Sequence, residues 1–301
     1  MSDEKLLSKK QFDVLSLLER ESGAFSQREI AAALGMSLGS VNKTMATLSE
    51  AGFVEDRLIT QKGLEALEPY RVRRAVFVAA GFGSRLVPIT LNTPKPLVRV
   101  KNTRIIDTLL DAVLAAGIKE IYIVRGYLAE QFDVLLSKYP MVKFIENPSY
   151  NEANNISSME CARFHLSNAY VLEADMLLYN PKIITKYQYD SNYLGFPVEM
   201  TDDWCFKVEG GLIKKVEVGG INCYQMVGIS YWTEEDGARL AGHIDDVYRS
   251  PGGKERYWDL VPLAYYADAY DVHIRECKRE DVVEIDTFGE LKAIDPTYAV
   301  I

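Results

Sequence analysis

The sequence predicts an α/β fold, in which a mixed and mostly parallel sheet carries helices on both faces and a small helical domain comes first. Two observations lead to this prediction. From Ala75 onward, short apolar runs alternate with amphipathic segments of about 10–15 residues, as in βαβ units. Residues 1–70 instead show three successive helical patterns. The chain of 301 residues is long enough for two domains, which we expect at 1–70 and 71–301.

The N-terminal segment is expected to form three helices and a β-ribbon. Ser26 is suited to cap the second helix and Gly35 to end it, and "VEDRLITQKG" fits a short ribbon after the third helix. This order of elements resembles the winged helix-turn-helix domain of bacterial regulators. The first helix gathers its apolar residues on one face: Phe12, Val14, Leu15, Leu17 and Leu18.

The charge of this segment leaves its binding partner open. Residues 1–70 contain 8 Lys and Arg against 11 Asp and Glu, a net charge of −3. A DNA-binding face normally concentrates cations. The candidate recognition helix offers one cation, with four further polar contacts: Lys43, then Ser37, Ser40, Asn42 and Thr44. DNA binding, dimerisation and an intramolecular regulatory contact therefore all remain open.

The second domain is expected to alternate strands and helices and then to become antiparallel. The first part predicts strands at 75–81, 118–126, 142–148 and 169–177, with helices at 103–117, 128–139 and 156–166. Four antiparallel strands are expected next, at 192–198, 204–210, 212–220 and 223–232. Helices near 233–249 and 254–267, strands at 270–277 and 281–286, and a helix at 287–294 complete the prediction.

A loop with two glycines follows the first of these strands, where a parallel sheet presents its binding crevice. Residues 79–97 read "AAGFGSRLVPITLNTPKPL". Gly81 and Gly83 lack Cβ atoms, so backbone N–H groups there can approach a phosphate chain. A dinucleotide fingerprint would need a third glycine at Leu86, which disfavours an NAD site, and no GxxxxGK[ST] motif occurs.

The same loop carries two cations that suit a triphosphate. Arg85 supplies a planar fork of donors, and Lys95 supplies a compact point charge. Together they can hold a triphosphate and neutralise the charge that develops as pyrophosphate leaves. We therefore expect both residues to act in catalysis.

Several blocks, in order along the chain, resemble the sugar-nucleotidyltransferase superfamily over residues 75–301. They are the glycine loop, "GYLAEQFDVL", "NPSYNEANNISSM", "EADMLLYN", "DDWCF", "RYWD" and "VEID". Within that superfamily the match is to the bacterial CTP:phosphocholine cytidylyltransferase family. The resemblance implies a Rossmann-like nucleotidyltransferase sheet and Mg²⁺ as cofactor. It also implies transfer of the cytidylyl group of CTP to a small phosphorylated amino alcohol, phosphocholine, to give CDP-choline and pyrophosphate.

The resemblance also implies that Asp175 and Asp286 hold the Mg²⁺ ion. The residues agree with this, because "VLEADML" and "VVEID" each place an acid at the end of an apolar strand. Mg²⁺ prefers oxygen ligands and a substrate phosphate. Glu284 could support the ion from behind this pair or bind the cationic head of the acceptor.

Nucleotide binding is expected from the glycine loop and from the start of one helix. The resemblance places Asn154, Asn155 and Ser158 near the base and ribose, although these residues could simply cap the helix beginning near Ile156. The loop contributes the other predicted nucleotide contacts: Ala79, Ala80, Gly81 and Gly83.

Aromatic residues beside an acid are expected to bind the head of the acceptor. The resemblance assigns this role to Trp204 and Tyr257, with Asp259 as the nearby carboxylate. A quaternary ammonium cannot donate N–H hydrogen bonds, and each aromatic face contributes about 0.5–2 kcal/mol to its binding. Core packing is the alternative for all three aromatics in these blocks, most of all for Trp258. Trp232 lies on an apolar strand and is expected in the core.

The composition limits the other classes of function. The net charge of −9 disfavours non-specific nucleic-acid binding by the whole chain, and no apolar run is long enough to span a membrane. Four scattered cysteines without a CxxC pair predict a reduced, cytoplasmic protein, and a homodimer stays open. Three alternatives remain. The acceptor could be phosphoethanolamine or 2-aminoethylphosphonate, for which acids would matter more than aromatics. It could be a sugar 1-phosphate, which is disfavoured because the segments after residue 200 do not resemble a sugar-binding domain. The protein could also be a regulator whose nucleotide site serves only as a sensor.

Overall fold

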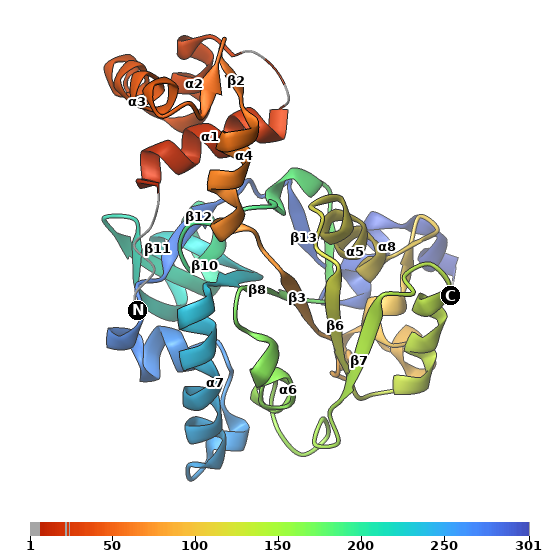
Figure 1. Ribbon diagram of the computed structural model, residues 1–301. Helices are drawn as coiled ribbons and strands as arrows, with labels where there is room; N and C mark the ends of the chain where they lie inside the picture. Colours follow the sequence, from red (N-terminus) through yellow and green to blue (C-terminus); the bar gives the residue numbers. More distant parts are fainter. Residues whose placement is uncertain (1–6, 22, 24, 301) are drawn as a thin grey trace. The chain divides into compact units, whose positions relative to one another are not determined.

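The computed structural model describes residues 7–21, 23 and 25–300 and divides the chain into two compact units (Figure 1). One unit is Met1–Arg71 with the short segment Tyr187–Tyr189, and the other is Val72–Lys186 with Asp190–Ile301. Among the described residues, every helix is too short or too polar to cross a bilayer. Each unit is described separately.

The first unit has the winged helix-turn-helix order predicted from the sequence. Ser26 forms a capping box with Glu29, in which Ser26 Oγ accepts from Glu29 N and Glu29 Oε2 accepts from Ser26 N. Gly35 ends that helix with a left-handed φ of 62°. The elements are α1 (Lys9–Glu21), α2 (Gln27–Leu34), α3 (Leu38–Glu50), the ribbon strands β1 (Val54–Glu55) and β2 (Leu58–Ile59), and α4 (Gln61–Leu67).

The core of this unit includes a segment distant in sequence. Tyr187 is buried within the same apolar cluster as the inner faces of α1 and α3. Tyr189 stacks on Tyr70 with ring centroids 5.3 Å apart, and its hydroxyl donates to Leu7 O at 2.8 Å. The five apolar residues expected on one face of the first helix are all buried. The division into domains at 1–70 and 71–301 stays a prediction.

Within the described residues of the second unit, seven strands form one mixed sheet in the order β10-β12-β11-β8-β3-β6-β7. Strands β8, β3, β6 and β7 are parallel neighbours, β10 and β12 are also parallel, and β11 runs antiparallel to β8. The bounds are β3 (Arg74–Val78), β6 (Glu120–Arg125), β7 (Val142–Glu146), β8 (Ala169–Glu173), β10 (Asn192–Glu209), β11 (Leu212–Trp232) and β12 (His273–Glu276).

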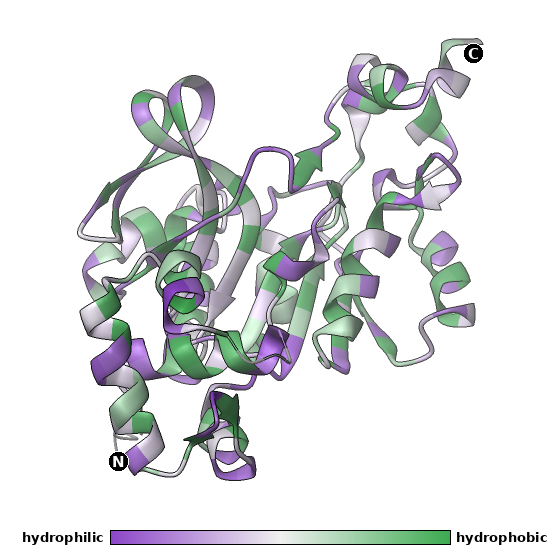
Figure 2. Ribbon diagram, turned by 90° about the horizontal axis from the view of Figure 1, so that it is seen from above, coloured by the Kyte–Doolittle hydropathy of each residue, from purple (hydrophilic) through white to green (hydrophobic). Residues whose placement is uncertain are grey.

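Helices cover both faces of this sheet, as predicted. Successive strand residues point to opposite faces, and in β3 the pair Ala75 and Phe77 joins one apolar cluster while Val76 joins another. The first cluster packs against α5 (Ile105–Ala115), and the second against α6 (Ile156–Ala162) and α7 (Glu234–Arg249). Figure 2 colours the central strands mainly as hydrophobic, consistent with burial on both sides.

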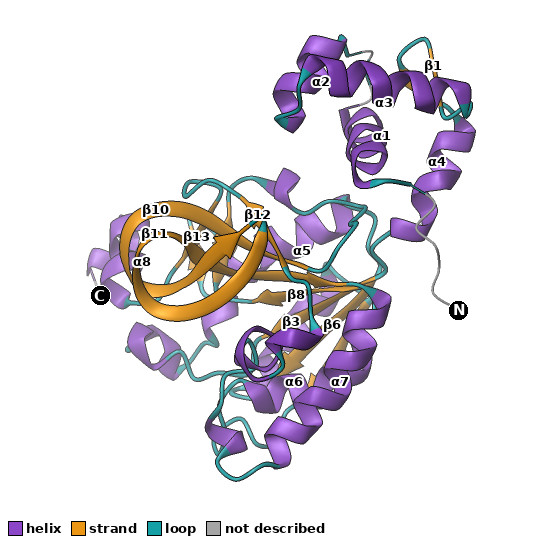
Figure 3. Ribbon diagram, turned by 90° about the vertical axis from the view of Figure 1, so that its left-hand side faces the viewer, coloured by secondary structure: helices purple, strands orange, loops and turns teal. Residues whose placement is uncertain are grey.

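The antiparallel part differs from the prediction of four strands. Two long strands, β10 and β11, curl into the ring seen in Figure 3. The glycines at 219 and 220 resemble a turn in the sequence, but here they sit where the ladder register shifts between Thr201 and Trp204, which is a β-bulge. Strand β11 therefore stays paired with β10 at the two glycines, where the sequence predicted that the strand would end.

Two helical predictions also need correction. The α-helix expected at 254–267 is wrong, since this segment contains turns and a five-residue π-helix at Val261–Tyr265. Pro262 has no N–H, and its ring would clash with a helical carbonyl four residues earlier. The helix expected at 128–139 is present but is a 3₁₀ helix, Ala129–Ser137.

A small two-stranded ladder lies beside the main sheet. Strand β9 (Met176–Leu178) pairs antiparallel with β13 (Val282–Glu284), so that Met176 faces Glu284. Ile285 N donates to Asp175 O at 3.3 Å, which continues the ladder by one residue. These three-residue strands bring two acidic segments together across more than a hundred positions of sequence. The last helix, α8 (Phe288–Ile294), follows directly.

Candidate active site

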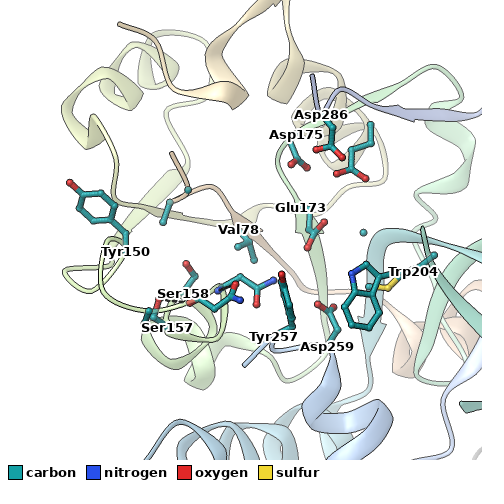
Figure 4. Close-up of a pocket in the computed structure, with 18 of the residues that line it drawn as sticks. Val78, Tyr150, Ser157, Ser158, Glu173, Asp175, Trp204, Tyr257, Asp259 and Asp286 are labelled. Atoms are coloured by element: carbon teal, nitrogen blue, oxygen red, sulfur yellow. Dashed lines mark hydrogen bonds between the residues drawn. The ribbon is translucent and has the colours of Figure 1, made fainter. Parts of the chain in front are cut away.

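Two adjoining cavities lie at the carboxyl ends of β3 and β8. The larger is about 700 Å³ and the smaller about 240 Å³. Five residues line both: Val78, Gly81, Arg85, Asp175 and Asp286. Figure 4 shows Asp175 and Asp286 at one end of the larger cavity, Trp204, Tyr257 and Asp259 grouped at another, and Glu173 between them. The site therefore forms where a parallel sheet is expected to bind its ligands.

Lys95 contacts both Asp175 and Asp286, the two acids that the resemblance assigns to the metal ion. Its Nζ lies 2.8 Å from Asp175 Oδ2 and 2.9 Å from Asp286 Oδ1. Arg85 reaches the same Asp286 Oδ1 at 2.7 Å from an exposed position. A capping box at Thr287 and Glu290 fixes Asp286 at the start of α8, because Glu290 Oε2 accepts from Asp286 N at 2.9 Å. The cations of the glycine loop therefore contact the two aspartates, as the sequence analysis expected.

The carboxyls at this end outnumber the cations. Burial is the largest influence on Lys95 and would lower its pKa, but the charges and hydrogen bonds of Asp175 and Asp286 outweigh it and raise the pKa. Burial, reinforced by the charges of Asp175 and Asp286, raises the pKa of Glu284 to about 8. Burial and then the charge of Asp175 raise the pKa of Glu173 well above its usual range. Without a further cation nearby, Glu173 and Glu284 are therefore held toward their neutral, protonated forms.

The acids also have the chemistry of a divalent metal site. Carboxylate oxygens of Glu173, Asp175 and Glu284 lie within 4.8 Å of one another. Asp175 Oδ1 is buried and has no hydrogen-bond partner among the described residues. Oxygen ligands of this kind suit a hard cation such as Mg²⁺. This cluster differs from the predicted pair, since Asp286 is engaged by Lys95 and Arg85.

Glu173 is a residue of this site that the sequence analysis missed. It is the last residue of β8, two positions before Asp175. A Cβ at Gly228 would lie 2.6 Å from Glu173 Oε2, so the glycine leaves room for the carboxylate. An acid that ends the apolar run "AYVLE" is the signal that could have identified it.

The two glycines of the loop meet different surroundings. Gly83 has a left-handed φ of 61°, and a Cβ there would lie 2.9 Å from Lys95 Cβ and 3.1 Å from Thr90 Cγ2. Gly81 lines both cavities, and a Cβ there would meet nothing within 4 Å. Leu86, which replaces the third glycine of a dinucleotide motif, is fully buried and anchors the loop in the cluster beneath α8.

Alanine at these glycines is expected to separate folding from ligand binding. Gly83→Ala should lower the free energy of unfolding by about 1–2 kcal/mol, because the residue is left-handed and the new methyl group would displace Lys95. Gly81→Ala should leave stability unchanged but raise the KM for a nucleoside triphosphate, because its methyl group fills ligand space. Urea unfolding and initial rates measure the two effects. Equal behaviour of both variants in both assays would contradict this assignment.

The predicted nucleotide-binding residues line the larger cavity, apart from Ala79 and Gly83, which line the smaller one. The helix-cap alternative is wrong for Asn155, which precedes α6 but makes no side-chain cap. Its Oδ1 instead accepts from Trp258 N at 3.0 Å. Ser158 Oγ accepts from Asn147 Nδ2 at 3.1 Å. Asn147 also lines the cavity and was missed, since a buried amide after a strand resembles a turn residue.

Two of the aromatic residues line the cavity, whereas the other two lie in the core. Trp204 and Tyr257 meet edge to face with centroids 5.6 Å apart. Trp258 is 1% exposed and packs at 6.2 Å from Trp232, which is fully buried as predicted. Core packing is therefore the correct alternative for Trp258. The aromatic part of the pocket offers two rings, not three.

Acids surround these two rings. Asp259 is buried, its carboxylate accepts from the Tyr193 hydroxyl, and burial raises its pKa to about 6. Asp203 also lines the cavity, next to Trp204. Among the described residues that line the larger cavity, Arg85 is the one cation, and its guanidinium pairs with Asp286 at the other end. The aromatic end thus combines two rings with carboxylates and suits an ammonium group.

Known proteins match both parts of the chain. Residues 74–181 match the nucleotidyl transferase family, and residues 7–58 match the MarR family. A 2-aminoethylphosphonate cytidylyltransferase from Lancefieldella rimae is 36% identical over 231 residues, covering 75% of this chain and 94% of that protein. A choline-phosphate cytidylyltransferase from Streptococcus pneumoniae is 29% identical, covering 74% and 96%. The solved CTP:phosphocholine cytidylyltransferase structure from Streptococcus pneumoniae has a TM-score of 0.70 at 29% identity, covering 75% of this chain and 99% of that one.

Proposed function

The chain belongs to the nucleotidyl transferase family, among its cytidylyltransferases, and we propose that it transfers the cytidylyl group of CTP to 2-aminoethylphosphonate. The family resemblance noted in the sequence is thereby confirmed. The proposed products are pyrophosphate and the mixed anhydride of CMP with the phosphonate. The observation that carries the proposal is a pair of adjoining cavities, with Lys95 and paired acids at one end and an acid-rich aromatic pocket at the other.

The balance of acids and aromatics supports a primary ammonium acceptor. Trp258 lies in the core, so two rings remain to face a cation. Asp203, Asp259 and Glu173 line the same cavity as those rings. A primary ammonium donates three hydrogen bonds to such acceptors, whereas a quaternary ammonium donates none. A 2-aminoethylphosphonate cytidylyltransferase is also among the relatives.

Phosphocholine is the second candidate acceptor. Trp204 and Tyr257 form an edge-to-face pair on the cavity wall, of the kind that binds a quaternary ammonium. Relatives and a solved structure named for this acceptor match over about three quarters of the chain.

The proposed reaction is a direct in-line displacement. A phosphonate oxygen forms a bond to the α-phosphorus of CTP as the bond from that phosphorus to the β-phosphate oxygen breaks. The acceptor oxygen is already anionic near neutral pH, so no general base is required. Lys95 and Arg85 neutralise the charge of the departing pyrophosphate, while Gly81 lets backbone N–H groups approach the triphosphate.

Binding of Mg²⁺ is part of the proposal. Asp175 and Asp286, which share the ammonium of Lys95, would hold it as the resemblance implies, and Glu173 and Glu284 cluster with Asp175 as further oxygen ligands. Bound there, Mg²⁺ would supply charge neutralisation to the phosphates of CTP. Trp204, Tyr257 and Asp259 orient the acceptor, and Lys95 neutralises the charge of the leaving pyrophosphate.

Pyrophosphate release tests this function. The full chain with MgCl₂ is incubated with CTP, UTP or ATP and with 2-aminoethylphosphonate, phosphoethanolamine or phosphocholine. The proposal expects the highest kcat/KM for CTP with 2-aminoethylphosphonate. A higher kcat/KM with phosphocholine would favour the second candidate, and no release with any pair would refute transferase activity on these acceptors.

The binding of the ammonium group is expected to depend on pH through Asp259. Burial raises the pKa of this carboxyl to about 6, so it is ionised above that pH and neutral below it. The kcat/KM for the acceptor in wild-type protein, divided by that in Asp259→Asn, should be constant above pH 7 and fall about tenfold at pH 5. The division cancels the titration of the substrates. A ratio that stays flat from pH 8 to pH 5 would contradict a role for the ionised carboxylate.

We further propose that the first unit binds DNA through α3. Its match to the MarR family and the exposed polar residues Asn42 and Lys43 on α3 support this. A gel shift on genomic DNA fragments at 50 and 200 mM salt tests it. Specific complexes should weaken in Lys43→Ala and at the higher salt. Absence of any complex at either salt would remove DNA binding and leave dimerisation or an intramolecular contact.

A further inference from the structure

A bulge in β10 turns two consecutive side chains toward the acceptor pocket. Thr201 faces Gly220 and Trp204 faces Val218, so Asp202 and Asp203 together oppose the single residue Gly219. Consecutive residues of a regular strand point to opposite faces of a sheet. Asp203 and Trp204 nevertheless both line the larger cavity. The bulge is what allows this, as bulges beside binding sites re-aim side chains.

Hydrogen bonds hold Asp203 in this position. Its backbone N donates to Thr201 Oγ1 at 3.1 Å, and its Oδ1 accepts from Trp204 N at 2.7 Å. Gln225 Nε2, on the neighbouring β11, donates to Asp203 Oδ2 at 3.3 Å. All these donors are neutral, and the charge of Asp203 has no cationic partner within salt-bridge distance among the described residues. The exposed carboxylate is therefore oriented at the mouth of the pocket, where no neighbouring cation of the described residues pairs with it.

We propose that Asp203 determines acceptor specificity by selecting an ammonium group that carries N–H donors over a trimethylated one. This inference rests on the proposed function. Asp259 supplies one fixed carboxylate and the rings supply cation–π contact, and both kinds of contact attract any ammonium. The Asp203 carboxylate, on β10, also attracts either kind of ammonium by its charge, but it gains a charge-assisted hydrogen bond only when the nitrogen carries an N–H group. Asp203 thus adds binding energy for a primary ammonium that a quaternary one cannot use.

The test measures kcat/KM for two acceptors that differ only at nitrogen: 2-aminoethylphosphonate and its N,N,N-trimethyl analogue. Asp203→Asn keeps the size and the oxygen that accepts from Trp204 N but removes the charge. Asp202→Asn is the matched control, since Asp202 is exposed on the same bulge and does not line the cavity. Asp203→Asn should lose about 10- to 100-fold of kcat/KM with the primary amine and less than threefold with the trimethyl analogue.

The ratio of the two acceptors decides the outcome. A loss in Asp203→Asn that is equal for both acceptors would mean a structural role and would overturn the inference, as would a ratio equal to that of Asp202→Asn. In both cases the wild-type protein still turns over, so the proposed function stands. No turnover by wild-type protein with either acceptor would overturn the proposed function together with this inference.

Discussion

The Lys95→Ala variant is expected to turn over CTP about 100- to 1,000-fold more slowly than the wild-type protein. Lys95 is 7% exposed and its ammonium lies between Asp175 and Asp286, where the leaving pyrophosphate would need a counter-charge. No other described lysine lines either cavity, so no neighbouring ammonium can replace it. Initial rates of pyrophosphate release with saturating CTP measure the effect on kcat.

Two further variants guard this prediction against a folding defect. Removing a buried cation leaves its acidic partners uncompensated, which can cost about 3–5 kcal/mol. Lys95→Met keeps the length of the buried stem, and the circular dichroism and Tm of both variants show whether they fold. Lys119→Ala removes a cation that is exposed and distant from the cavities, and should act as wild type. A folded Lys95→Met with near wild-type kcat would refute the role of Lys95.

The Asp175→Asn variant is expected to lose both turnover and metal binding. Asp175 Oδ2 accepts from Lys95 Nζ, and the second, buried oxygen of Asp175 has no partner among the described residues. An amide in its place would remove the charge that suits a divalent ion. We expect a drop in kcat of at least about 100-fold and a weaker affinity for Mn²⁺, followed by electron paramagnetic resonance. Excess EDTA should abolish the wild-type rate, and MgCl₂ should restore it.

An exposed acid provides the control for the metal experiment. Asp268→Asn removes one negative charge from the surface and should bind Mn²⁺ as the wild-type protein does. Unchanged Mn²⁺ affinity in Asp175→Asn, or full wild-type turnover in EDTA, would contradict a metal site at this aspartate.

Most of the fold follows from patterns that the sequence displays directly. Strand β3 is apolar from Ala75 to Val78 because both of its faces are buried, and the capping box at Ser26 marks the start of α2. The length of strands β10 and β11 was predicted wrongly, because Gly219 and Gly220 lie at a bulge rather than in a turn. The segment at 254–267 has helical spacing, but Pro262 and local packing override it. Tyr189 could not be assigned to the first unit, because its packing on Tyr70 has no local signature.

The candidate site divides in the same way. Gly83 and Lys95 lie in one loop, where a glycine and a cation after a buried strand indicate phosphate binding from the sequence alone. Asp175 and Asp286 follow apolar segments, which makes both acids recognisable as site candidates. The contact that unites the two acids is the three-residue ladder of β9 with β13, too short to be recognised from a sequence. Asp203 was missed because its orientation depends on the bulge, and bulges are set by pairing between distant strands.

The central claim is that this site joins the α-phosphate of CTP to a phosphonate and releases pyrophosphate. A ³¹P NMR spectrum of the full chain with CTP, 2-aminoethylphosphonate and MgCl₂ tests it most directly. We expect the CTP signals to decline while free pyrophosphate appears together with two mutually coupled signals, one from a phosphate and one from a phosphonate. CTP that stays intact, or that yields CDP and orthophosphate without a coupled phosphonate signal, would contradict the claim.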